Sequence, residues 1–81
     1  MAEQLNPKDV TLLLEEATQS LSGSLEPATD LKALEGWDSM GMVMFMGLVH
    51  ERAGFELSVH DLRECETVSA LTQMISERQR V

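Results

Sequence analysis

The chain has 81 residues, which is enough for one domain with one modest hydrophobic core. Hydrophobic residues make up 43% of it and charged residues 25%, a balance typical of globular proteins and unlike that of disordered chains. Six basic against fourteen acidic side chains give a formal net charge of −8. This charge argues against nucleic acid or an anionic membrane as partner and favours proteins that carry basic patches.

Three further features bear on the compartment. Cys65 is the single cysteine, so an intrachain disulfide is excluded. No window approaches the ~20 apolar residues that a membrane span needs, so membrane insertion is not expected. The first residues include several acids and no long apolar stretch, which argues against a secretory signal. We therefore expect a monomeric protein of the cytoplasm.

The first helix is predicted to follow a flexible tail over residues 1–5, with one domain over residues 6–81. Asn6 is the expected N-cap, Pro7 the first helical residue, and Asp9 lies near the positive end of the helix. Apolar side chains then recur at helical spacing: Val10, Leu13, Leu14, Ala17 and Leu21. The Ser-Gly-Ser run at 22–24 is predicted to end this helix.

A long connection over residues 22–37 comes next, and loops of this length generally carry function or structure of their own. Leu25, Leu31, Leu34 and Trp37 recur along it as apolar anchors. We expect a loop packed onto the helices, with a helical turn near residues 30–34. Trp37 is interpreted as a packing anchor for this loop.

The rest of the chain predicts three more helices. A long one should begin at Asp38 and run to about residue 53, with Gly54 as its C-terminal stop. A short helix is expected over residues 59–63, capped by Ser58, and a last helix from Thr67 to about residue 79. No strand-like alternation persists beyond a weak Phe-Glu-Leu. The fold class is therefore all-α, with three longer helices, one short helix and a long loop between the first two helices.

Ser39 is the candidate functional residue. With Asp38 as N-cap, its hydroxyl lies at the positive end of the second helix, where free N–H groups and the helix dipole favour an anion. Such a serine is well placed to carry a phosphate ester. The alternative is that Asp-Ser is only a helix cap. A hydrolytic nucleophile is disfavoured, because the chain has no G-x-S-x-G motif and His50 lies three helical turns away.

Three segments together resemble the acyl carrier protein family: LKALEGWDSMGMVMFM at 31–46, AGFEL at 53–57 and TVSALTQMI at 67–75. The matching features are Gly36-Trp37, the Asp-Ser-Met core at 38–40, Gly54 with apolar residues after it, and Thr67-Val68. The resemblance covers about residues 6–77 and includes the freestanding carriers of polyketide, nonribosomal-peptide and aminoacyl pathways.

The resemblance implies a four-helix bundle and a single carrier domain over residues 6–81. It implies that Ser39, next to the capping Asp38, carries covalent 4′-phosphopantetheine, whose thiol holds an acyl cargo as a thioester. Such a protein is not an enzyme. Its implied partners are a phosphopantetheinyl transferase and the acyl-loading, synthase and tailoring enzymes of fatty-acid, polyketide or related lipid biosynthesis. Alternatives are an aminoacyl or peptidyl carrier, or an unmodified helical adaptor that binds a partner helix.

The second helix is apolar on two sides. Met42, Phe45, Met46, Val49 and Ala53 share one face, which we assign to the core. The other side carries Met40, Val43, Met44, Gly47 and Leu48, a region that is usually acidic in the resembled family; here Glu51 is the main acid. We expect partial burial of Met40 and Val43 under the loop and last helix, and an exposed Leu48, with Met44 left open. The predicted partner surface is Met40, Val43, Met44, Leu48 and Glu51.

His60, Asp61 and Cys65 are disfavoured as metal ligands, because no second pair of ligands accompanies them. Cys65 is instead predicted to be a small buried side chain between the short helix and the last one.

Overall fold

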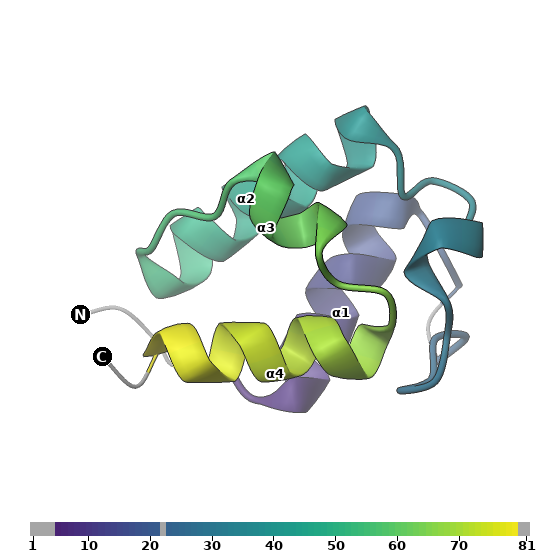
Figure 1. Cartoon of the computed structure of the whole chain (residues 1–81), viewed down its shortest axis with the longest axis horizontal. Coiled ribbons are helices and arrows are strands. Elements are labelled where there is room, and N and C mark those ends of the chain that lie inside the picture. Colours follow the sequence, from purple (N-terminus) through teal and green to yellow (C-terminus); the bar gives the residue numbers. More distant parts are fainter. Residues whose placement is uncertain (1–4, 22, 80–81) are drawn as a thin grey trace.

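Four α-helices make up most of the fold in the computed structural model, which describes residues 5–21 and 23–79 (Figure 1). They are α1 (Pro7–Thr18), α2 (Ser39–Ala53), α3 (Val59–Arg63) and α4 (Val68–Gln79), with one turn of 3₁₀ helix, η1, at Leu31–Ala33. Over the described residues no strand forms, and the β-type pairing there is an isolated bridge between Asp30 and Thr67. The predicted all-α class, with three longer helices and one short, is confirmed.

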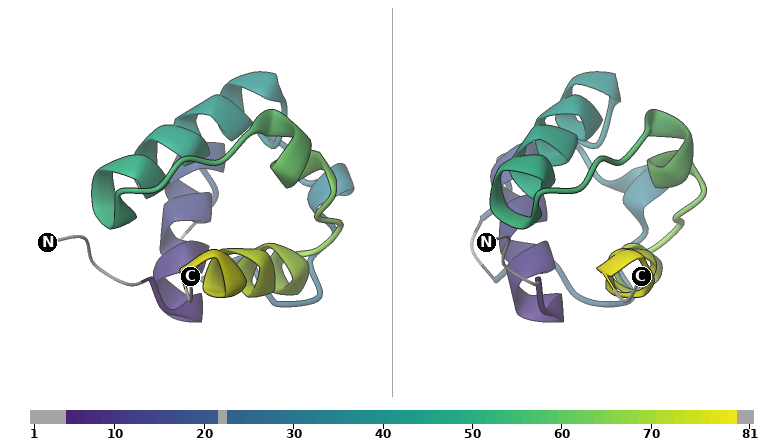
Figure 2. Two further views of the ribbon diagram at one scale, coloured as in Figure 1. Left: turned by 60° about the vertical axis from the view of Figure 1, so that its left-hand side comes forward. Right: turned by 90° about the vertical axis from the view of Figure 1, so that its left-hand side faces the viewer.

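α1 is the central helix of the bundle. It packs against both α2 and α4, and α2 packs in turn against the short α3. Figures 1 and 2 show α2 and α4 on two levels, with α1 running from one level to the other. The long loop leaves the end of α1, passes the start of α4, and returns to the start of α2. None of the described helices combines the length and the apolarity needed to cross a bilayer.

The start of α1 follows the prediction. The side chain of Asn6 accepts a hydrogen bond from the Asp9 amide at 2.8 Å, and the Asn6 amide donates to the Asp9 carboxylate at 3.2 Å. This reciprocal pair satisfies helix donors that would otherwise be free. The apolar stripe is buried at Val10, Leu13, Leu14 and Ala17.

The end of α1 differs from the prediction. The helix stops at Thr18 because Gln19 takes the left-handed conformation, with φ of 57°. The Ser20 amide then donates to the Glu15 carbonyl at 2.9 Å, so the chain has already turned away at Leu21, which is 82% exposed. The carboxylate of Glu15 is buried and accepts from the Gly23 amide at 2.8 Å, which holds this turn in place. Leu21 was wrongly assigned to the buried stripe.

Leu5 also differs from the prediction, which placed it in the flexible tail. Its side chain is buried, and its carbonyl accepts a hydrogen bond from the side-chain amide of Gln79 at 2.8 Å. The Leu5 amide donates to the same side chain. Leu5 therefore ties the chain before α1 to the end of α4. The remainder of the predicted tail, residues 1–4, lies outside the described residues.

The loop between α1 and α2 is anchored as predicted. Leu25, Leu31 and Trp37 are buried and Leu34 is half-buried, with η1 at the expected helical turn. Backbone hydrogen bonds fasten the loop to the start of α4. The Leu31 amide donates to Glu66, the Val68 amide to Thr29 and the Ser69 amide to Pro27, at 2.8, 3.1 and 2.9 Å.

The core face of α2 is also as predicted. Met42, Phe45, Val49 and Ala53 are buried, and Met46 is half-buried against the same cluster. The rings of Trp37 and Phe45 meet edge to face, with centroids 5.6 Å apart and planes at 77°. Trp37 is therefore a packing anchor that fixes the loop just before α2 begins.

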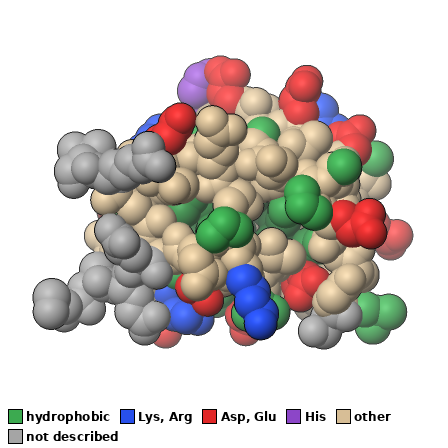
Figure 3. Space-filling view, turned by 90° about the horizontal axis from the view of Figure 1, so that it is seen from below, with side chains coloured by type: hydrophobic (Ala, Val, Ile, Leu, Met, Phe, Trp, Pro, Cys, Tyr) green, Lys and Arg blue, Asp and Glu red, His purple; other side chains and the backbone are tan. Residues whose placement is uncertain are grey.

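Seen from below, acidic side chains lie around the rim of the molecule and hydrophobic ones form small separate groups (Figure 3). The exposed large hydrophobic side chains of α2 are Met40, Val43 and Met44.

Candidate functional site at the start of α2

Asp38 sets the first residue of α2. Its backbone is extended, and its carboxylate accepts a hydrogen bond from the Gly41 amide at 2.9 Å. Its carbonyl accepts the first helical hydrogen bond, from the Met42 amide, at 2.8 Å. The predicted cap at Asp38 and the stop at Gly54, which is left-handed with φ of 78°, are both confirmed.

Ser39 is consequently the first helical residue, at the end of α2 that lies uppermost in Figure 1. Its side chain is exposed, and among the described residues no hydrogen bond engages its hydroxyl. The amides of the first turn point toward the space around it, so the helix dipole and free N–H groups favour an anion there. A free hydroxyl in this position fits the attachment of a phosphate diester.

An apolar surface begins directly beside Ser39. Met40, Val43 and Met44 are 81%, 56% and 51% exposed. Together with Ser39 they line a shallow hollow of about 410 Å³. We call Met40, Val43 and Met44 the outer patch. It is the part of the predicted partner surface that lies next to the candidate serine.

Two expectations for this surface were wrong. Met40 is exposed and not partly covered, and Val43 is more exposed than expected at 56%, because the described part of the loop is fastened to the start of α4 and does not cross α2. Leu48, expected to be exposed, is half-buried against the core. It lies about 60° from Phe45 around the helix, at ~100° per residue, and so belongs to the border of the core face.

Charge along α2 is low and unevenly placed. The first turn holds no acidic side chain, and the last turn holds His50 and Arg52. Glu51 is exposed, as expected, but lies at the far end of the helix from Ser39. His50 is separated from Ser39 by about 16 Å of helix rise, so the two cannot form a nucleophile–base pair. Within α2, Ser39 is therefore followed by an apolar surface, and His50 lies too far away to act as its base.

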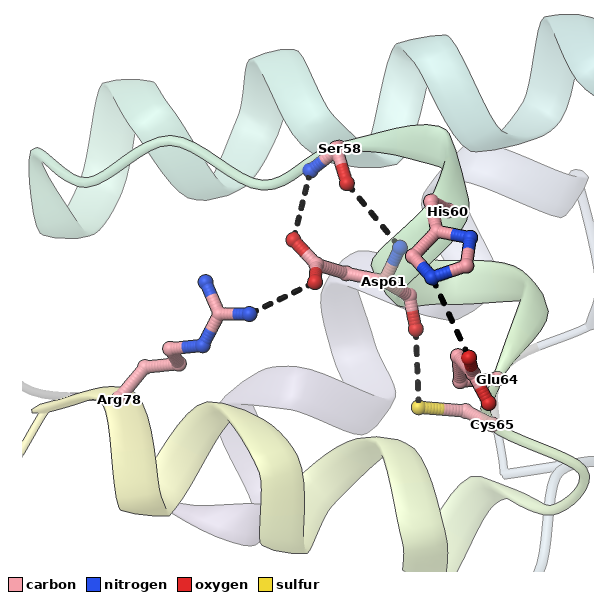
Figure 4. A network of polar contacts seen from close by, with 6 residues as sticks. All are labelled: Ser58, His60, Asp61, Glu64, Cys65 and Arg78. Atoms are coloured by element: carbon pink, nitrogen blue, oxygen red, sulfur yellow. Dashed lines mark hydrogen bonds and ion pairs between the residues drawn. The ribbon is translucent and has the colours of Figure 1, made fainter.

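The polar side chains around α3 hold the short helix in place (Figure 4). Asp61 and Ser58 cap the start of α3 reciprocally, and Asp61 also pairs with Arg78 of α4 at 2.7 Å. The hydrogen bond from the Ser58 amide lowers the pKa of the Asp61 carboxyl most, and the Ser58 side chain and the contact with Arg78 lower it further. The Asp61–Arg78 pair could not be predicted from the sequence, because the two residues come together only through the fold.

His60 and Cys65 have other partners as well. The His60 imidazole lies 3.3 Å from the carboxylate of Glu64, one turn along α3. Cys65 is buried, as predicted, and its thiol donates to the Asp61 carbonyl at 3.6 Å. Burial raises the pKa of the Cys65 thiol, and the nearby acids Asp61 and Glu64 raise it further. No group of three or more potential metal ligands is gathered anywhere within residues 5–21 and 23–79.

Comparisons with known proteins identify the family of the chain. Those with curated proteins and with solved structures found no match. A family model described as the phosphopantetheine attachment site matches residues 8–75, which span most of α1, the loop, all of α2 and α3, and most of α4. The free hydroxyl of Ser39, at an exposed helix start, is chemically suited to that attachment. The chain belongs to the phosphopantetheine-attachment family of carrier proteins, whose covalent cofactor is 4′-phosphopantetheine.

Proposed function

We propose that the protein is an acyl carrier and that Ser39 is the residue to which 4′-phosphopantetheine is attached. The observation that carries this proposal is the Ser39 hydroxyl, which is exposed and unengaged by the described residues at the start of α2. The family match supports the cofactor, and the geometry supports this serine as its site.

Each neighbouring residue has a role in this proposal. Asp38 holds the first turn of α2 through the Gly41 amide, which keeps Ser39 at the end of a rigid helix. During modification the Ser39 hydroxyl would lose its proton to the transferase or solvent, and its oxygen would bond to the pantetheine-bearing phosphorus of coenzyme A. The pyrophosphate bond of coenzyme A would break at the same time and release adenosine 3′,5′-bisphosphate, next to the positive end of the helix dipole. The cofactor supplies a terminal thiol, on which an acyl group is carried as a thioester. No side chain of the protein is assigned a catalytic role.

The outer patch is proposed as the surface that partner enzymes contact. Met40, Val43 and Met44 surround the hollow beside Ser39, so an enzyme that reaches this serine must also meet them. Flexible thioether side chains adapt to differently shaped partners. Leu48 and Glu51 would lie at the margin of this surface. The partners we propose are a phosphopantetheinyl transferase and the loading, synthase and tailoring enzymes of fatty-acid, polyketide or related lipid biosynthesis. A single, buried cysteine is in keeping with work in a reducing compartment such as the cytoplasm.

The decisive experiment is modification followed by intact mass measurement. Incubation with a broad-specificity phosphopantetheinyl transferase and coenzyme A should add one phosphopantetheine to the wild-type protein and none to Ser39→Ala. Ser69→Ala is the matched control, because Ser69 is also an exposed serine in the first turn of a helix, α4. An unmodified wild type, or full modification of Ser39→Ala, would overturn the assignment. The mass of thioesters that co-purify with the protein would then separate acyl from aminoacyl cargo.

A further inference from the structure

Two glycines come into direct contact around Ser39. The carbonyl oxygen of Gly36, in the loop, occupies the space in which a side chain on Gly41 would begin. A Cβ atom added to Gly41 would lie 1.9 Å from that oxygen and 3.1 Å from its carbon. Real Cβ atoms essentially never approach backbone atoms so closely. Any other residue at position 41 must therefore separate the loop from the first turn of α2.

Gly36 is confined on its other side as well. Its φ of +91° lies in the left-handed region, which favours glycine. A Cβ atom on Gly36 would lie 2.6 Å from the carbonyl oxygen of Thr18, the last residue of α1. Gly36 is thus inserted between the end of α1 and the start of α2, and backbone contacts backbone on both of its sides.

Ser39 lies in the short segment that this contact closes. Trp37 is held at one end of the segment by its edge-to-face contact with Phe45. Asp38 is held by the hydrogen bond that it accepts from the Gly41 amide at 2.9 Å, and its carboxylate oxygen would lie 3.6 Å from an added Cβ. If Gly36 moves away from Gly41, the displacement falls on Asp38 and Ser39, because Trp37 is fixed in the core.

Gly47 provides the contrast within the same helix. It lies six residues further along α2, it is exposed, and a Cβ atom there would meet nothing within 4 Å. Alanine is therefore compatible with position 47 and incompatible with position 41 in the present arrangement. Of these two positions, only Gly41 must lack a side chain.

We propose that Gly41 is a positioning residue for the modification of Ser39. Its contact with Gly36 sets how the first turn of α2 meets the loop and hence where the Ser39 hydroxyl is presented to the transferase. The inference rests on the proposed function of Ser39. It concerns a close backbone approach specific to this chain and requires no contact between Gly41 and the cofactor.

The test is the steady-state kinetics of phosphopantetheinylation with Gly41→Ala, and with Gly47→Ala as the matched control. We expect kcat to fall by about 10- to 100-fold in Gly41→Ala, because a small misplacement of a reacting group carries a cost of this size. KM for the carrier should stay near the wild-type value, since Val43 and Met44, two of the three residues of the outer patch, lie in the part of α2 beyond the disturbed turn. Gly47→Ala should match the wild type in both constants.

A second readout is independent of the enzyme. In the unmodified protein, the amide at position 41 should exchange with solvent faster in Gly41→Ala, because Asp38 no longer holds it. Amides in the middle of α2 should keep their protection. Gly47→Ala should show no change at position 41.

The double variant Gly41→Ala/Gly47→Ala tests whether a lower kcat comes from loss of folding. Alanine at the open position 47 stabilises the helix and should offset destabilisation by alanine at position 41. Circular dichroism should show this variant to be folded at the assay temperature. A normal kcat in Gly41→Ala would overturn the inference and leave Ser39 as the site. Loss of helix in the double variant would also overturn it, since the contact would then serve the fold itself. An unmodified wild type would instead refute the proposed function.

Discussion

Replacing Phe45 by alanine should lower the free energy of unfolding by about 3–5 kcal/mol, the usual cost of deleting a fully buried ring. The Phe45 side chain is 0% exposed and meets Trp37 edge to face at 5.6 Å, so the substitution removes both buried area and an aromatic contact. A domain of 81 residues has a total stability of about 4–12 kcal/mol. The variant should therefore lose between a quarter and all of its stability.

Urea denaturation followed by circular dichroism measures this loss, with the fluorescence of the single Trp37 as a second probe. Met44→Ala is the matched control, because Met44 is the preceding residue of the same helix and is 51% exposed. Its free energy of unfolding should change by no more than ~0.5 kcal/mol. A loss of less than about 1 kcal/mol in Phe45→Ala, with an unchanged slope against urea, would refute the assignment of Phe45 to the centre of the core.

Two further predictions concern the outer patch and α3. Met44→Glu should strongly reduce turnover by a partner enzyme without changing the melting temperature. Leu12→Glu is the control, at a residue of α1 that is 47% exposed, and it should leave turnover intact. Equal turnover of the two variants would contradict the proposed docking surface. The pKa of Asp61 lies below its ordinary value of 3.8, so its stabilising effect is complete above that pH and is lost as pH falls through the lowered pKa. The stability difference between wild type and Asp61→Asn, measured by urea denaturation, should shrink on acidification from about pH 5 to pH 2, and a difference independent of pH would contradict this role.

Local chemistry in the sequence predicted the helix starts. Asn6 with Asp9, Asp38 with Gly41, and Ser58 with Asp61 each place a side-chain acceptor opposite a free amide within three residues. Such caps form between neighbours along the chain, so they can be predicted from the sequence alone. The position of Ser39 followed from the same logic, since a cap at Asp38 makes the next residue the exposed first member of the helix.

Features that depend on distant segments were not predictable in this way. The end of α1 requires a left-handed Gln19, a conformation that glutamine rarely adopts and that a buried Glu15–Gly23 hydrogen bond supports here. The exposure of Met40 depends on which helix the long loop crosses, and periodicity in α2 carries no information about that. The Gly36–Gly41 contact likewise joins a loop to a helix. In the sequence, Gly36 is an ordinary turn residue and Gly41 an ordinary helix residue, so their contact could not be predicted.

The fastening of the loop to α4 has a consequence for how the molecule unfolds. The first two amides of α4, Val68 and Ser69, donate to the carbonyls of Thr29 and Pro27, and the Ala70 amide donates to the Thr67 hydroxyl. The N-terminal cap of α4 is therefore built largely from residues some forty positions earlier in the chain. A helix of 12 residues is marginal in isolation, so α4 cannot keep its start once the loop lifts away. Loop and helix should thus open as one cooperative unit, and protection of the Val68 and Ser69 amides reports on that shared opening and not on fraying of a helix end.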